Sequence, residues 1–239
     1  MNRLTAPIMI AAVLLLGSLS ACADSAGPGS GRTSKPSAPH STNDAYANIP
    51  ANEIHTAGTD VDFIWEPKDP FYGFSKYPIV ARVHIESIGG GRTFSPIDNQ
   101  YVFPQTVGKM TVREVYKGDI AAGAEVNYSR VGGTVTFDEY WNSLNNAQQE
   151  KILRLNGGAK PADAKYIKAK ITDDVDLEAG KEYVALLTPR SGQDGRLSEY
   201  SVQGYQYGLR EVKGTGAETS LLNNETHEWE SLGSFVKLP

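Results

Sequence analysis

The alternation of apolar and polar residues predicts that most of this chain is β-structure. Residues 79–86 alternate apolar and polar side chains, as in a strand with one buried face, and residues 166–172 repeat that pattern. Residues 182–188 (EYVALLT) are almost continuously apolar, which is typical of a central, well-buried strand. Further strands are expected at 107–116, 125–131, 201–207 and 209–213, the last two as a hairpin around Gly208, and Gly89 to Gly91 should form a flexible turn.

One helix is expected to interrupt the strands. Residues 147–155 are rich in helix formers, follow the capping candidates Asn145 and Asn146, and end before an Asn-Gly-Gly sequence. Residues 138–144 could extend this helix upstream. The pattern predicts a mostly β fold, a small OB-like β-barrel or sandwich with one inserted helix, over a single domain at 61–239.

The start of the chain follows a different pattern. A short, positively charged beginning precedes an apolar run at 8–16, and small residues follow it. A membrane-spanning helix needs about 20 apolar residues, so this run is too short to be one. It has the length of the apolar core of a signal peptide, and residues 1–21 are therefore expected to be a signal sequence.

The tetrapeptide Leu19-Ser20-Ala21-Cys22 matches the lipobox of bacterial lipoproteins. The Cys22 thiol would accept a diacylglyceryl group, and the small residues before it suit cleavage between Ala21 and Cys22. Cys22 is the only cysteine in the chain, so lipidation also accounts for a lone thiol in an exported protein. Each buried CH₂ of an acyl chain contributes about 0.8 kcal/mol, and two chains give stable attachment. We expect a lipid-anchored protein on the extracytoplasmic face of the cell membrane; the alternative is an ordinary secretory signal with a chance cysteine.

The residues after the lipobox read as a spacer. Sixteen of the twenty residues at 23–42 are Ala, Ser, Gly, Pro or Thr, and none is large and apolar. Such a segment cannot bury enough surface to offset its ordering entropy. We therefore expect residues 22–60 to form a disordered tether that carries the lipid at its first residue.

The charge of the chain argues against some partners. The whole chain has 23 Lys and Arg against 28 Asp and Glu. Residues 1–21 hold one Arg and no acid, so the mature net charge is −6. Nucleic acids and anionic lipid surfaces attract basic patches, so no nucleic-acid partner is expected.

Three local features carry a resemblance to a known family. They are VREVYKG at 112–118, LEAGKEY at 177–183 and the segment between Gly204 and Gly208. Their order resembles the OB-like barrel of netrin-type and tissue-inhibitor-like modules, and that of uncharacterised surface lipoproteins of Gram-positive, actinobacterial type. The resemblance implies a barrel over roughly 77–213. Those modules are cross-linked by disulfides, which this chain cannot form, and their inhibitory chemistry is not carried over.

The sequence offers no recognisable catalytic set, metal site or cofactor. The histidines at 40, 55, 84 and 227 lack metal-ligand spacing, and the acidic run at 173–178 lacks the pattern of a calcium loop. We interpret that run as a solvated turn. There is no nucleophile elbow and no phosphate-binding loop. Asp138, Glu139 and Glu150, near the predicted helix, could supply the two carboxylates of a glycosidase, although carboxylates at a helix start are more often partners of the helix dipole.

The one unusual concentration is aromatic. Residues 63–77 hold six aromatic side chains, interleaved with Pro and Gly. They could form a ligand platform, for which Trp65, Phe71, Tyr72, Phe74 and Tyr77 are the candidates, or they could plug the end of the barrel as part of its core. Tyr205 and Tyr207, on one face of a predicted strand, could extend either arrangement.

These observations favour a membrane-anchored lipoprotein that acts as a binding or interaction module of the cell envelope. Its partner would be a cell-wall polymer or an envelope protein. Two alternatives remain open: an enzyme, or enzyme accessory, acting on cell-wall polymer, and a carrier of a small ligand at the barrel mouth.

Overall fold

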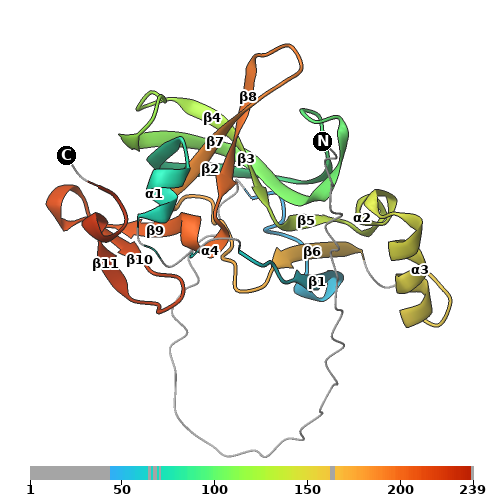
Figure 1. The fold of residues 1–239 in the computed structure, drawn as a ribbon. Coiled ribbons are helices and arrows are strands. Elements are labelled where there is room, and N and C mark those ends of the chain that lie inside the picture. The colour runs from blue at the N-terminus through green and yellow to red at the C-terminus, as the bar shows by residue number, and fades with distance from the viewer. Residues whose placement is uncertain (1–43, 64–65, 67–68, 70, 162–164, 238–239) are drawn as a thin grey trace, which may run out of the picture.

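The computed structural model describes residues 44–63, 66, 69, 71–161 and 165–237 (Figure 1). The predicted signal peptide, the lipobox with Leu19, Ser20, Ala21 and Cys22, and the platform candidate Trp65 lie outside the described residues.

The fold is mostly β, as the hydrophobic pattern predicted. Its strands are β1 (Ile54–Thr59), β2 (Ile79–Ser95), β3 (Gln100–Lys117), β4 (Glu125–Val131), β5 (Gly133–Thr136), β6 (Tyr166–Ile171), β7 (Glu182–Ser191), β8 (Leu197–Gln203), β9 (Leu209–Lys213), β10 (Ser220–Leu222) and β11 (Trp229–Ser231). Its helices are α1 (Tyr72–Lys76), α2 (Phe137–Ser143), α3 (Asn146–Leu155) and α4 (Tyr205–Gly208), with short 3-10 turns at Ala51–Glu53, Gly216–Glu218 and Leu232–Ser234.

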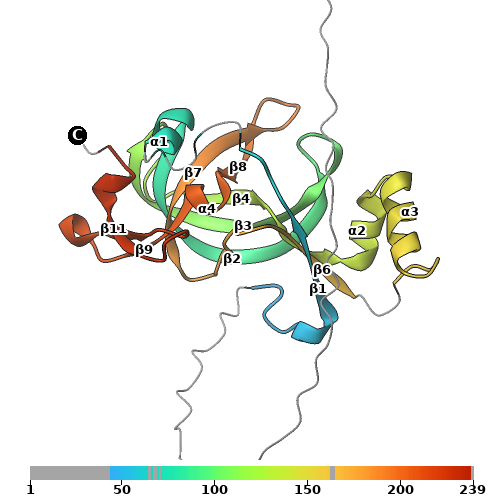
Figure 2. The same cartoon turned by 60° about the horizontal axis from the view of Figure 1, so that its bottom comes forward.

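Five strands close into a ring. Strand β2 is paired with β3 and β7, β3 with β4, and β4 with β8, which in turn pairs with β7. All of these pairs are antiparallel except β4–β8, which is parallel. This is the connectivity of an OB-like barrel, and it is visible as the curved sheet of Figure 2. Strands β9, β10 and β11 extend the sheet outward from β7.

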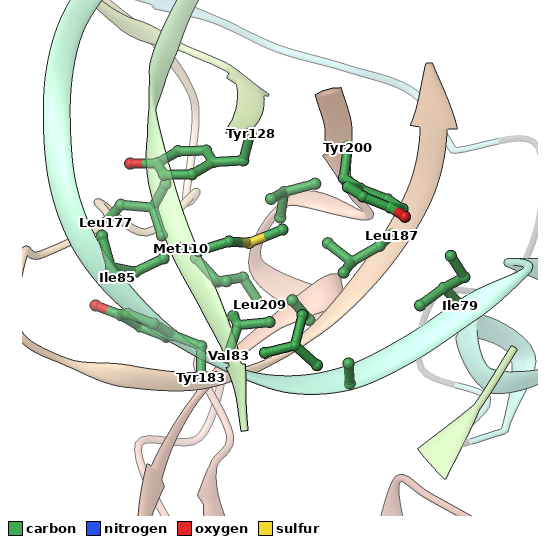
Figure 3. Packing of buried hydrophobic residues seen from close by; sticks show 14 of the residues in the cluster. Ile79, Val83, Ile85, Met110, Tyr128, Leu177, Tyr183, Leu187, Tyr200 and Leu209 are labelled. Atoms are coloured by element: carbon green, nitrogen blue, oxygen red, sulfur yellow. The ribbon is translucent and has the colours of Figure 1, made fainter. Parts of the chain in front are cut away.

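The interior of the ring is filled with side chains. Ile79, Ala81, Val83 and Ile85 alternate into the core, which confirms the pattern seen at 79–86. Figure 3 shows these β2 residues meeting side chains from the facing strands. Besides these four residues, the buried cluster contains Ile88, also of β2, and Met110, Val112, Tyr128, Leu177, Tyr183, Ala185, Leu187, Tyr200, Val202 and Leu209.

A second apolar cluster lies on the other side of β2 and β7. Val80, Val184 and Leu186 point away from the barrel interior and pack against Leu221 and Phe235 from the C-terminal part of the chain. Strand β7 is therefore covered on both faces, which explains its continuous apolar sequence. Phe74 and Tyr77 pack against this cluster as half-buried residues.

A small second sheet has the order β1-β6-β5. Strand β1 runs parallel to β6, with Ile54 opposite Tyr166. The folded region therefore begins earlier than the boundary at 61 that we predicted, because residues 54–59, assigned to the tether, complete this sheet. Their polar composition concealed a strand that is an edge and needs few apolar residues.

The chain between β5 and β6 holds two helices where one was predicted. Thr136 and Asn145 each form a capping box, with Glu139 and Gln148 respectively. The helices are separated at Leu144, which has extended backbone angles. The predicted helix at 147–155 matches α3, and the possible extension upstream is the separate helix α2.

The predicted hairpin at 201–213 is wrong. Strands β8 and β9 both pair with β7, at different parts of it, and not with each other. The helical turn α4 joins them, so Tyr205 and Tyr207 lie on a helix instead of one face of a strand. The alternating pattern continued through a segment whose backbone conformation is set by two glycines, Gly204 and Gly208.

Candidate functional site

An aromatic pocket lies where β8 turns into α4. It is a cavity of about 210 Å³. Its walls come from the segment before α1, the residue that follows α1, the ends of β4 and β8, and the start of α4. The lining residues are Asp62, Phe63, Tyr77, Val131, Val202, Gln203, Gly204 and Tyr205.

The Phe63 ring makes steep edge-to-face contacts with two tyrosine rings. The Phe63 and Tyr205 ring centroids are 5.9 Å apart with planes at 71°. The Tyr207 ring contacts Phe63 in the same way, at 5.5 Å and 82°. Edge-to-face pairs of this kind are favoured by the ring quadrupoles and contribute about 0.5–1.5 kcal/mol each. The rings therefore hold one another in fixed orientations.

The hydroxyl groups of Tyr77 and Tyr205 remain protonated at neutral pH. Burial raises the pKa of Tyr77, and the nearby Tyr72 and Tyr205 side chains raise it further. Burial also raises the pKa of Tyr205. These groups can donate as well as accept hydrogen bonds, so the pocket combines ring surfaces with neutral polar groups.

Tyr205 has a left-handed backbone conformation. Its φ angle is 48°, and Gly204 before it has a φ angle of 81°. An L-residue with a bulky side chain rarely adopts this conformation, which costs on the order of 1–2 kcal/mol. The turn is tight as well, because a Cβ atom at Gly208 would lie 1.9 Å from the Gln203 carbonyl oxygen. The fold thus holds the Tyr205 ring at the pocket through a strained backbone.

A buried ion pair lies beside this pocket. The Arg130 guanidinium contacts the Asp174 carboxylate at 2.5 Å, and both side chains are almost fully buried. Arg130 also donates to the Val175 carbonyl oxygen, and the Val175 N–H donates to Asp174. Burial raises the pKa of Asp174, against the effect of the guanidinium. Both groups influence the pKa of Tyr205, which places them near its ring.

Sequence reasoning missed this ion pair. The acidic run at 173–178 was interpreted as a solvated turn, but its second residue, Asp174, is buried. The available signal was Arg130, which follows the inward-facing Tyr128 by two residues and so lies on the same face of β4. A charged side chain at an inward position requires a buried partner of opposite charge.

The platform candidates are divided between different surroundings. Tyr77 lines the aromatic pocket together with Tyr205, whereas Tyr72 lies near Tyr77 and is not part of the pocket lining. Phe74 packs against the second apolar cluster, and Phe71 lies beneath the Lys237 ammonium at 5.2 Å. The candidates do not form one flat exposed platform, and each of these four side chains is partly buried.

Lys117 fixes the segment that carries these rings. Its Nζ donates to the carbonyl oxygens of Phe74, Ser75 and Tyr77 at 2.6, 3.1 and 2.7 Å. These groups belong to the C-terminal end of α1, where unpaired carbonyls favour a cation. The same ammonium lies 5.5 Å from the Phe74 ring centroid.

The carboxylates considered for catalysis have other contacts. Asp138 pairs with Lys160 at 2.6 Å, and Glu139 forms the capping box of α2. Glu150 is exposed on α3. Across the described ranges, no group of three or more His, Cys, Asp or Glu side chains is arranged to hold a metal ion. In the same part of the chain, no helix has the length and apolar character needed to cross a membrane.

Comparison with known proteins gives no match: neither a protein-family model, nor a curated protein, nor a solved structure is significantly similar to this chain.

Proposed function

We propose that this protein is a lipoprotein of the cell envelope, anchored through Cys22 to the extracytoplasmic face of the membrane, and that its β-domain is a binding module. The observation that supports binding most strongly is the strained Tyr205 in an aromatic pocket. Backbone strain of this kind costs free energy and is concentrated at functional sites. Glycine would adopt this left-handed conformation without steric cost, whereas Tyr205 adopts it while its ring contacts Phe63 and lines the pocket.

The chemistry of the pocket favours a glycan segment of a cell-wall polymer as the ligand. A sugar ring has an apolar C–H face that stacks on aromatic rings such as Phe63, Tyr77 and Tyr205. Its hydroxyl groups need neutral or acidic hydrogen-bonding partners, which the Gln203 amide and the Asp62 carboxylate provide. Rigid aromatic walls bind at low entropic cost because few rotamers are lost.

The other two functions have less support. A carrier would need an empty apolar interior, but the core side chains occupy the inside of the barrel (Figure 3). A glycosidase would need two carboxylates facing one site, whereas Asp138 and Glu139 lie at the start of α2 and are engaged in an ion pair and a helix cap.

The binding proposal is tested with the mature chain, residues 22–239, made without lipid as Cys22→Ser. We expect it to co-sediment with purified cell-wall polymer, and Tyr205→Ala to lose most of that binding. Tyr101→Ala is the matched control, because Tyr101 is 59% exposed and lies on the β2–β3 hairpin away from the pocket. Equal binding by the Tyr205 and Tyr101 variants would refute the site. Binding to envelope proteins but not to the polymer would refute the glycan.

The anchor is tested separately. Cys22→Ala removes the thiol that would accept the lipid, so we expect it to abolish lipid labelling and to release the protein from the membrane fraction. Ser20→Thr keeps a small residue beside an intact thiol and serves as the control. Membrane retention and labelling of the Cys22→Ala protein would exclude the lipoprotein assignment.

A further inference from the structure

Exposed apolar side chains gather at the ends of two hairpins. In the described part of the chain, five large hydrophobic side chains are exposed, and three of them are Phe94, Tyr101 and Leu197. Phe94 and Tyr101 face each other across the β2–β3 hairpin, with ring centroids 5.6 Å apart at 81°. Leu197 begins β8, opposite Ser191 at the end of β7. We call these three residues the hairpin patch.

Ion pairs hold the two hairpins together. Asp98, in the turn between β2 and β3, binds Arg190 of β7 at 2.5 Å. Arg92 of β2 binds both carboxylate oxygens of Glu199 on β8, at 3.0 and 2.6 Å. Figures 1 and 2 show the two hairpins projecting from the barrel. The hairpin patch is therefore held in position before any partner arrives, which reduces the entropy cost of binding.

Most charges beside the hairpin patch are paired within the protein; the exception is the exposed Arg196 next to Leu197, whose contact with Asp194 is long, at 3.8 Å. Besides the two pairs above, Lys109 of β3 binds Glu125 of β4 at 2.8 Å. Among these groups, an approaching apolar medium would have to desolvate only Arg196 without a close partner. Aromatic side chains of this kind are enriched where proteins meet the boundary between lipid and water.

The point at which the described chain joins the sheet lies on β2, the strand that also carries Phe94 of the hairpin patch. The Ala45 N–H donates to the Ile88 carbonyl oxygen at 3.0 Å, and Asp44 forms a bridge with Ile88. Ile88 and Phe94 are six residues apart on β2, a separation of at most about 20 Å. Cys22 is joined to this point by residues 23–43, so the membrane is within reach of this side of the domain.

We propose that the hairpin patch rests on the lipid–water interface of the membrane that holds Cys22, and so orients the domain on its tether. This inference rests on the proposed lipid anchor. Phe94, Tyr101 and Leu197 would insert at the level of the headgroups, while the lipid on Cys22 supplies most of the membrane affinity. Glycan binding at the Tyr205 pocket does not depend on this contact.

The test uses the lipidated mature chain in vesicles of phosphatidylcholine and phosphatidylglycerol. The only native thiol carries the lipid, so Gln100→Cys gives a single site on the hairpin for an environment-sensitive fluorophore. Arg154→Cys, at an exposed position of α3, is the matched control. We expect the emission at position 100 to shift to the blue and to be quenched by brominated lipid, with no change at position 154. Phe94→Ser together with Tyr101→Ser should abolish the shift.

Four results would overturn the inference. An unchanged emission at position 100 in protein that floats with the vesicles would exclude the contact while leaving the anchor intact. Equal quenching at positions 100 and 154 would indicate an unoriented domain. A shift at position 100 that requires an added envelope protein would make the hairpin patch a protein-docking surface. Protein that does not float at all would refute the anchor, and with it the contact that rests on the anchor.

Discussion

Replacing Tyr205 by alanine or by glycine removes the same ring but leaves two different backbones. Alanine keeps a Cβ atom at a φ angle of 48°, as tyrosine does, whereas glycine adopts this angle without steric cost. Both variants lose the edge-to-face contact with Phe63 and the burial of a half-buried ring. The difference in stability between the two variants therefore measures the backbone strain at Tyr205.

The expected magnitudes follow from these losses. A fully buried aromatic ring costs about 3–5 kcal/mol when it is cut back to alanine, so a half-buried one should cost about 2 kcal/mol. Glycine recovers about 1–2 kcal/mol of left-handed strain and loses about 0.5–1 kcal/mol through chain entropy. Tyr205→Gly should then be more stable than Tyr205→Ala by about 0.5–1 kcal/mol, which is roughly 2–3 °C in Tm for a domain of this size.

Urea unfolding followed by tryptophan fluorescence measures both free energies, and equal m-values are required for the comparison. Tyr207 supplies a control of opposite sign. It lies in α4, contacts the same Phe63 ring and does not have a positive φ angle, so Tyr207→Gly should be less stable than Tyr207→Ala. If Tyr205→Gly is as unstable as Tyr205→Ala, or less stable, Tyr205 is not strained and the main support for the binding site is lost.

Two further substitutions test the supports of the site. Lys117→Met removes a cation that three carbonyl groups share, so we expect a loss of about 2–3 kcal/mol in urea unfolding, and an unchanged midpoint would contradict this role. Arg130→Met leaves the Asp174 carboxylate buried without its partner and should cost about 3–5 kcal/mol at pH 7, most of which Asp174→Leu in the same chain should restore. Burial raises the folded-state pKa of Asp174 above its unfolded value. Protonation of Asp174 therefore stabilises the fold at low pH, and this contribution is lost as pH rises through the folded-state pKa. The Arg130→Met deficit should therefore be smaller at pH 4 than at pH 7, and a deficit independent of pH would refute this explanation.

The barrel strands were predictable because each has a simple burial pattern. Residues 79–86 have one face in the core, and residues 182–188 are covered on both faces by the two apolar clusters. In both cases local periodicity reports directly on tertiary packing. The predicted turn at Gly89 to Gly91 is wrong, because these residues continue β2. A Cβ atom at Gly91 would lie 1.9 Å from the Thr134 carbonyl oxygen, so this glycine allows β5 to cross β2 closely, and no local pattern reports such a crossing.

The candidate site was predictable only in part. The aromatic segment at 63–77 was recognised, and one of its platform candidates, Tyr77, lines the pocket, but the central residue of the pocket comes from a segment more than 120 positions later. Tyr205 was assigned to a strand because a left-handed tyrosine cannot be inferred from residue types. Asp174 and Arg130 are separated by 44 residues, and the antiparallel pairing of β5 with β6 brings the end of β4 to the chain that follows β6. Both misses concern long-range contacts that a single sequence does not encode in its local pattern.

The attachment of residues 44–46 to β2 also has a mechanical consequence. Any tension applied from the N-terminal side first meets the hydrogen bond from Ala45 to Ile88 and the ring of Tyr46, which packs against the barrel core. The backbone of Gly91 holds the Tyr46 hydroxyl as a second point of attachment. The load therefore passes into the longest sheet of the domain before it reaches β1, the edge strand that such a force would otherwise peel from β6. A pull on residues 44–46 should therefore load the large sheet before it loads the pairing of β1 with β6.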